Sequence, residues 1–196
     1  MLSPHPAIPA MACNRPPRPG RWIMAPGMKY GLLAAVGMTA WLFCAYALGF
    51  HGAHIALAQY VEWGSAVILV VTLWRMLRWQ VLAPERRWLP VWVGLLQGLY
   101  TSLVAALGFY IAYALYLRFV HPDYPDLYLE WRVAQMRTSG VAEENIRTMA
   151  REYRWSMGPI GLPLTLIAFQ LLVGFFASPI LTLWLNFRRE KLGFTR

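Results

Sequence analysis

Four long runs of apolar residues divide this chain, and each is close to the length that a helix needs to cross a bilayer. They cover residues 30–50, 55–76, 91–117 and 160–187. About 20 helical residues span the hydrocarbon core of a membrane. The second run is the least apolar, because it contains Gln59 and Glu62. In the fourth run, Pro163 and Pro179 are expected to bend or break the helix.

A charged, amphipathic insert, residues 121–157, separates the third and fourth runs and predicts a helical hairpin. Asp123 can cap its first helix, and Ser139-Gly140 would end that helix, since glycine suits the left-handed cap. The second helix starts near Glu143, which pairs favourably with Arg147 four residues later. Apolar residues recur at helical spacing as two stripes, Leu127, Tyr128, Trp131 and Ala134 on the first helix and Ile146, Met149, Ala150 and Tyr153 on the second.

The first 27 residues differ from the rest, because they are rich in Pro and Arg and lack apolar periodicity. They contain no apolar stretch of about 7–15 residues, which a secretory signal needs, so we expect a disordered tail. Met28-Lys29-Tyr30 resembles a natural start, which makes residues 1–27 a candidate upstream mis-start of translation. Residues 28–196 are predicted to form a single membrane domain.

Composition and charge agree with an all-α integral membrane protein. Hydrophobic residues make up 58% of the chain and charged residues 14%, whereas soluble domains average about 45–50% and 25%. The net charge of +9 could suggest nucleic acid, but the excess Lys and Arg flank the apolar runs on one predicted side. This asymmetry places both termini in the cytoplasm and the hairpin on the outer side. We expect the bacterial inner membrane, with the lipid bilayer as partner and no nucleic acid.

Small residues recur every four positions along the third run, as Gly94, Gly98, Ser102 and Ala106. Such a stripe lets two helix backbones approach closely. It could be the face of a homodimer, but packing against another span of the same chain is favoured, with Gly174 and Ser178 as the natural partner surface. The same run has a polar side that could line a pathway or make interhelical hydrogen bonds, formed by Gln97, Tyr100, Thr101, Tyr110, Tyr113 and Tyr116.

The predicted topology gathers ionisable side chains near the outer ends of the spans. They are His51, His54, Glu62, His121 and Asp123, with Asp126 nearby. A zinc site needs three or four such ligands, but the spacing of His51 and His54 alone is a weak signal, so interfacial polar residues are favoured and no metal or cofactor is expected. Glu62 stands out, since charge inside hydrocarbon is expensive, although headgroup depth would explain it. We expect it to lie near one of the three histidines or water.

Several short segments together resemble a bacterial membrane family, domain of unknown function 4199. They are Met28-Lys29-Tyr30-Gly31, Gln97-Gly98, His121-Pro122-Asp123-Tyr124 and Ser139-Gly140-Val141-Ala142-Glu143-Glu144. Ala142 departs from the serine expected there as a helix cap. The resemblance covers residues 28–196 and implies four membrane helices with an extramembrane helical insert. It implies no established activity.

Nothing in the sequence supports nucleophilic catalysis, a phosphate loop or a metal-binding cysteine pair, so we do not expect an enzyme. The leading hypothesis is an interaction or accessory component of the membrane, with another membrane protein or a second copy of the chain as possible partner. The alternative is a small transporter or ligand-binding membrane protein, and an intramembrane enzyme comes third. A closed, apolar interior favours the first hypothesis, whereas a polar cavity that reaches Glu62 or Gln97 favours the second.

Overall fold

The computed structural model describes residues 19–81 and 88–191, except for the side chains of residues 19–24, 59, 62, 190 and 191. Every regular element in these residues is a helix, as the apolar periodicity predicts. Their order is α1 (Pro19–Ala47), the short 3-10 helix η1 (Ile55–Leu57), α2 (Ala58–Val81), α3 (Val91–Phe119), α4 (Tyr124–Thr138), α5 (Glu143–Ser156) and α6 (Gly161–Lys191).

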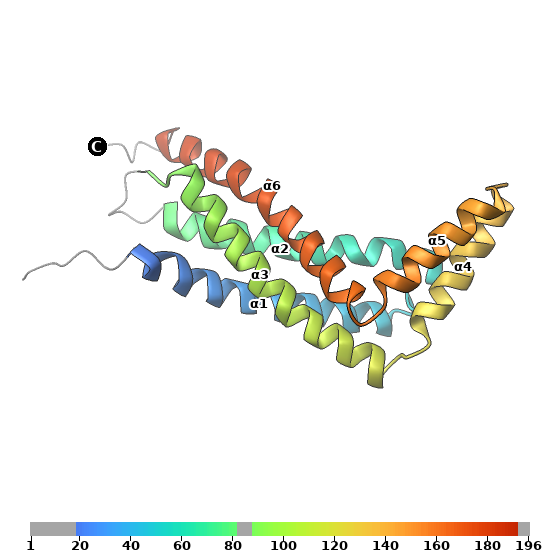
Figure 1. Ribbon diagram of the computed structural model, residues 1–196. Helices are drawn as coiled ribbons and strands as arrows, with labels where there is room; N and C mark the ends of the chain where they lie inside the picture. Colours follow the sequence, from blue (N-terminus) through green and yellow to red (C-terminus); the bar gives the residue numbers. More distant parts are fainter. Residues whose placement is uncertain (1–18, 82–87, 192–196) are drawn as a thin grey trace, which may run out of the picture.

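The four long helices lie side by side as a bundle, and the α4–α5 hairpin extends from one end of it (Figure 1). The most extensive contacts are α1 with α3 and α3 with α6, and α2 then packs on α6 and α1. The helices therefore form a ring in which α2 and α3 are diagonal and touch little. Side chains from all four helices fill the centre, among them Met38, Leu69, Leu73 and Phe109. The start of α1 and the end of α6 lie at the end opposite the hairpin.

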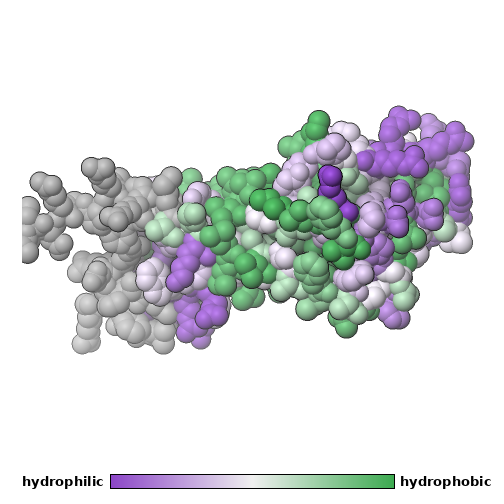
Figure 2. Space-filling model, turned by 90° about the horizontal axis from the view of Figure 1, so that it is seen from below, coloured by the Kyte–Doolittle hydropathy of each residue, from purple (hydrophilic) through white to green (hydrophobic). Residues whose placement is uncertain are grey.

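Three of these helices are long and apolar enough to cross a membrane: Ala25–Ala47 in α1, Val91–Phe119 in α3 and Gly161–Arg189 in α6. Helix α2, the second predicted span, is not among them, and Arg75 and Arg78 lie near its end. Large apolar side chains are nevertheless exposed on all four helices. Figure 2 shows hydrophobic residues across the middle of the bundle and hydrophilic residues toward both of its ends, more of them toward the hairpin.

The first long helix starts earlier than predicted, and the fourth apolar run is not broken at its prolines. Helix α1 begins at Pro19, so residues 19–27 belong to a helix and not to a disordered tail. Proline is favourable at the start of a helix, where its missing N–H is not needed. In the fourth predicted span, α6 continues unbroken past both prolines. Pro163 is the third residue of α6, where it interrupts no hydrogen bond, and only Pro179 lies within the helix body.

The hairpin forms where it was predicted, and its turn uses glycine as expected. Gly140 has φ +72°, the left-handed conformation, and the next N–H, that of Val141, donates to the carbonyl of Met136 at 3.1 Å. This pair of features is the usual glycine-terminated helix end. Gly49 ends α1 in the same way, with φ +76° and a bond from Phe50 N–H back to Ala45.

Three details of the hairpin differ from the sequence prediction. Asp123 precedes α4, but its side chain makes no cap hydrogen bond. Glu143 forms its ion pair with Arg137 across the turn, at 3.0 Å, and the predicted partner Arg147 contributes only a weaker electrostatic attraction. This pair raises the pKa of Arg137 and lowers that of Glu143 through its hydrogen bond. The first apolar stripe is also rotated, because Leu127 and Ala134 are exposed while Tyr124 and Leu129 are buried.

Small residues set the closest approaches between the long helices. A Cβ added at Gly98 would overlap Ser178, and one at Gly174 would overlap Ser102, so α3 and α6 meet almost backbone to backbone. Gly94 faces Thr182 along the same line. On the other side of α3, a Cβ at Gly31 of α1 would lie 2.9 Å from the carbonyl oxygen of Thr101. The stripe of Gly94, Gly98 and Ser102 thus packs within the chain, while Ala106 is fully buried farther along α3.

Candidate functional site: a cavity beneath the hairpin

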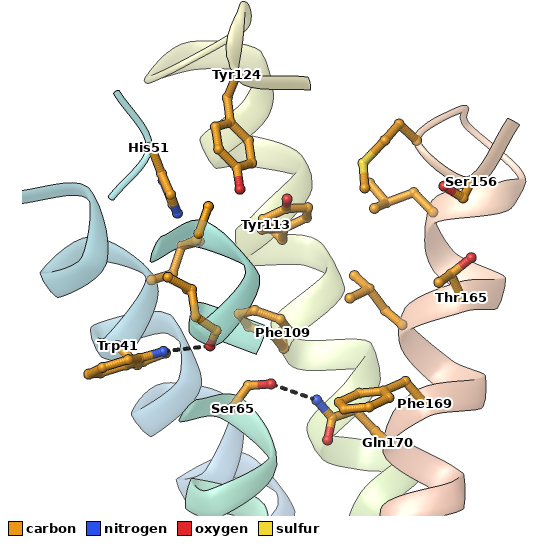
Figure 3. Close-up of a pocket in the computed structure, with 16 residues that line it drawn as sticks. Trp41, His51, Ser65, Phe109, Tyr113, Tyr124, Ser156, Thr165, Phe169 and Gln170 are labelled. Atoms are coloured by element: carbon orange, nitrogen blue, oxygen red, sulfur yellow. Dashed lines mark hydrogen bonds between the residues drawn. The ribbon is translucent and has the colours of Figure 1, made fainter. Parts of the chain in front are cut away.

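A cavity of about 140 Å³ lies at the hairpin end of the bundle. All four long helices contribute to its wall, and the largest wall residues are aromatic: Trp41 from α1, Phe109 and Tyr113 from α3, and Phe169 from α6 (Figure 3). The hairpin contributes Tyr124 at its start and Ser156 and Met157 at its end. The hairpin leaves the bundle at an angle (Figure 1), and the residues at its two ends form part of the cavity wall.

The cavity also contains a buried amide–hydroxyl pair. Gln170 Nε2 of α6 donates to Ser65 Oγ of α2 at 3.3 Å (Figure 3). Gln170 is fully buried, and Ser65 is only 5% exposed. The Oε1 atom of Gln170 has no hydrogen-bond partner, although a buried amide normally satisfies both its oxygen and its nitrogen. Because Gln170 is fully buried, this oxygen lies within the wall and not on the surface of the cavity.

Trp41 is fixed at the wall by two contacts of its indole ring with α2. Its Nε1–H donates to the carbonyl oxygen of Val61 in α2 at 2.8 Å, as Figure 3 shows. The ring lies directly against Gly64, where an added Cβ would overlap it. Both contacts pin the indole between α1 and α2, so this wall is preformed.

His51 closes the cavity near the hairpin, in the connection between α1 and α2. It is 98% buried, and its Nδ1 shares a hydrogen bond of 2.5 Å with the hydroxyl of Tyr116. Its ring also lies 4.3 Å from the ring of Tyr124, measured between centroids. Burial, and secondarily the proximity of His121, lowers the pKa of His51 from 6.5 to about 4. The imidazole is therefore neutral at neutral pH.

Aromatic contacts continue from this histidine into the hairpin. Tyr124 lies 6.2 Å from Tyr128 in the next turn of α4, and Tyr128 lies 5.5 Å from Tyr153 of α5, ring centre to ring centre. On the bundle side, His51 lies 5.4 Å from Tyr116. Aromatic pairs at such separations are favourable beyond the area they bury. A chain of aromatic contacts thus connects the hairpin to the bundle, and it passes through two cavity residues, His51 and Tyr124.

The predicted outer cluster is only partly assembled. His51 and His121 lie on either side of shared tyrosine rings, those of Tyr46, Tyr116 and Tyr124. His54 and Asp123 are exposed, and the side chain of Glu62 lies outside the described residues. Among the residues that the structure describes, no three His, Cys, Asp or Glu side chains are placed to hold a metal ion.

Sequence reasoning named Gly174 and Ser178 of the fourth long helix but missed its other buried polar residues. Gln170, Ser178, Thr182 and Asn186 are all buried, and Gly174 completes a four-residue spacing from 170 to 186. This spacing was visible in the sequence but was masked by the apolar residues around it. Arg189, which looks like a flanking cytoplasmic charge, is 95% buried, and its Nη1 donates to the carbonyl oxygen of Val81 at 2.6 Å.

Comparison with known proteins identifies a family whose description states no activity. The family model described as Protein of unknown function (DUF4199) matches residues 29–186, which is most of the chain. No curated protein and no solved structure matches the chain. The cavity is therefore the best basis for a functional argument.

Proposed function

This chain belongs to the family Protein of unknown function (DUF4199), and we propose that it is a four-span membrane protein that binds a small molecule beneath its hairpin. The cavity is the single observation that carries this proposal. Ligand sites are typically concave, mostly apolar and preformed, with a few placed polar groups, and the cavity has each of these properties. The proposed function is binding without catalysis.

The outward face of α2 supports its assignment as the fourth span. Trp63, Val67 and Val71 are 65%, 60% and 49% exposed. In water this face would expose a large apolar surface, which is unfavourable, whereas lipid would cover it. Farther along, Trp79 is 67% exposed beside Arg78, a pairing that suits the interface between lipid and water. Between Trp63 and Trp79, α2 rises about 24 Å at 1.5 Å per residue, close to the thickness of the hydrocarbon core.

The distribution of Lys and Arg supports the proposed orientation in the bacterial inner membrane. The segment between α1 and α2 contains no Lys or Arg, whereas Arg188 and the residues after it are strongly basic. Both termini are then cytoplasmic, and the hairpin and the cavity lie at the outer surface. A ligand would reach the cavity from that surface or from the outer leaflet.

The cavity does not support a transport pathway. Gln97, whose exposure to a cavity would favour transport, is fully buried and is not one of the cavity residues. Beyond Gln170, α3 and α6 are in tight contact at Gly98 and Gly174, and neither glycine lines the cavity. Binding at one end is therefore favoured over passage through the bundle.

The test compares what co-purifies with the wild-type chain and with variants whose cavity is filled. Ala58 is 97% buried at the cavity wall, and Thr165 lines it from α6, so Ala58→Leu and Thr165→Phe each place new atoms inside. Both variants and the wild type are purified in nanodiscs, and small molecules are identified by mass spectrometry. A compound held by the wild type and absent from both filled variants is expected. Equal small-molecule content in all three would overturn the proposal.

One observation favours an interaction role as a second function. The hairpin extends beyond the bundle (Figure 1), and its second helix exposes Arg147 and Arg151 one turn apart. Helices of this kind, outside the membrane, are available to a partner membrane protein or a second copy of the chain. A partner recovered in mild detergent by the wild type and lost by the Arg147→Glu, Arg151→Glu double variant would support this role.

A further inference from the structure

The second helix of the hairpin carries a stripe of three arginines. Arg147, Arg151 and Arg154 of α5 are all exposed. Because about 3.6 residues make one helical turn, their spacing of four and then three residues places them within an arc of about 60°. The inward side of α5 lies elsewhere, since Ile146 is buried and the ring of Tyr153 lies 5.5 Å from a tyrosine ring of α4. The stripe therefore points away from the core of the hairpin.

The acidic residues of α5 do not neutralise this stripe. Glu152 lies about 100° or more around the helix from each of the three arginines. The two glutamates of the first turn stand at the tip of the hairpin, and one of them, Glu143, is paired with Arg137. The helix dipole favours a basic residue in the last turn, which explains Arg154 but not Arg147. From Arg147 onward, α5 carries three positive charges and one negative charge.

The end of this stripe lies beside the residue at which α6 begins. A Cβ added at Gly161, the first residue of α6, would overlap the carbonyl oxygen of Trp155. Trp155 is therefore level with the start of a helix that is long and apolar enough to cross a membrane. Its side chain is 60% exposed, and an exposed tryptophan at this position is typical of the interface between lipid and water. The last turn of α5 thus lies at the depth of the lipid headgroups.

The whole stripe is close enough to the membrane to be attracted by charged headgroups. Arg147 precedes Arg154 by two turns, which is about 10 Å along the helix at about 1.5 Å per residue. Because the hairpin is inclined to the bundle (Figure 1), the difference in height between these two arginines is smaller than this distance. Electrostatic attraction extends over about 8 Å at physiological ionic strength. All three guanidinium groups therefore lie within range of the headgroup layer.

We propose that α5 docks on the membrane beside α6, and that Arg147, Arg151 and Arg154 bind the phosphate groups of anionic phospholipids. A guanidinium donates two parallel hydrogen bonds to a phosphate, and Trp155 anchors the end of the helix in the interface. Lipid is favoured over an acidic protein as the partner, because α6 already holds the stripe beside a lipid surface. This inference goes beyond the proposed function, since it requires that α6 crosses the membrane and does not depend on the cavity.

Hydrogen exchange of α5 in the full chain measures this docking. The chain is placed in nanodiscs of phosphatidylcholine alone, and in nanodiscs in which about one third of the lipid is the anionic phosphatidylglycerol. The test variant carries Arg151→Gln and Arg154→Gln. The control variant carries Arg132→Gln and Arg137→Gln, which also remove two charges from the hairpin but lie on α4, outside the stripe. Each chain is compared with itself in the two nanodiscs, so a change in the intrinsic stability of a variant cancels.

The expected slowing follows from the attraction of single arginines. An arginine near an anionic membrane surface strengthens association about fivefold, so three together give a factor on the order of 100. Exchange of residues 143–156 in the wild type should therefore be slower by up to about 100-fold in the anionic nanodiscs than in the neutral ones. The test variant should keep a ratio of about five, and the control variant the full ratio of the wild type. At about 1 M salt the ratio should fall toward unity.

Two outcomes would overturn the inference. One is equal exchange of α5 in the two nanodiscs, and the other is a ratio that the test variant shares with the wild type. If α5 exchanges equally in both nanodiscs, and a protein is recovered in mild detergent by the wild type but lost by the test variant, the stripe binds a protein instead of lipid. None of these outcomes bears on the cavity, which is tested separately by the filled variants Ala58→Leu and Thr165→Phe.

Discussion

Gly98→Leu should separate the two helices that meet most closely in the bundle. A Cβ at position 98 would lie 2.5 Å from Ser178 Cβ and would overlap Ser178 Oγ. Carbon atoms in contact lie about 3.5–4.0 Å apart, so α3 and α6 would have to separate by about 1 Å for the first added atom alone. The rest of the leucine side chain adds to this separation. Contacts at Gly94 and Gly174 would loosen with it, because they lie along the same line.

The magnitude follows from the cost of overpacking. Extra atoms forced into a packed interior destabilise by about 1–3 kcal/mol, and leucine at a backbone contact falls at the upper end. For a chain of about 150–250 residues, 1 kcal/mol corresponds to about 2–4 °C in the thermal midpoint. We therefore expect Gly98→Leu to lower the midpoint by about 6–12 °C in detergent. Gly52→Leu is the matched control, since nothing lies within 4 Å of a Cβ there.

A rescue variant tests whether the clash itself is responsible. Gly98→Ala alone should destabilise, and Ser178→Gly in the same chain should restore most of the loss, since the nearest remaining atom would be the Gly174 carbonyl oxygen at 3.4 Å. If Gly98→Leu melts with the Gly52→Leu control, the α3–α6 contact is not as described. If Gly98→Leu keeps its midpoint and changes the oligomeric state, the stripe is a homodimer face.

Three further predictions follow from the hairpin and its surroundings. The free energy of unfolding should fall by up to about 3 kcal/mol as the pH decreases from 6.5 to 4, because His51 is protonated at a higher pH in the unfolded chain than in the folded one. Equilibrium unfolding of the His51→Gln variant should not show this pH dependence, whereas the variant at the exposed His54, His54→Gln, should keep it. Glu143→Gln should leave the midpoint of denaturant unfolding unchanged, since its ion pair with Arg137 is exposed and screened by solvent. A reporter after Arg196 should be cytoplasmic and a tag near Ser139 accessible from outside, and an external C-terminus would contradict the four-span topology.

The helices could be predicted because their signals are local. Uncharged runs of about 20 residues identify α1, α3 and α6, and Ser139-Gly140 marks the turn of the hairpin. The boundary at Pro19 was missed, because a Pro- and Arg-rich segment has weak helical periodicity. The stripe of small residues that includes Gly98 could also be predicted from a local signal, because its four-residue spacing lies within a single apolar run.

The cavity could not be predicted, because it depends on the order of helices around the bundle. Ser65 and Gln170 are 105 positions apart, and they meet only because α2 packs on α6. Trp41 reaches Val61 through the contact of α1 with α2, a pairing that no spacing in the sequence encodes. The burial of His51 likewise depends on the angle at which α4 leaves α3, which places Tyr124 over the imidazole.

The polar residues at the two ends of the bundle have different consequences. At the end opposite the hairpin, Arg189 and Asn186 of α6 donate to the carbonyl oxygens of Val81 and Leu89, so they join the end of α2 and the start of α3 to the bundle. The middle is held by glycine contacts that allow little movement. At the hairpin end, Gln170 retains an unused acceptor beside a void. The polar side chains at one end therefore join helices to one another, whereas those at the hairpin end lie in the wall of a cavity.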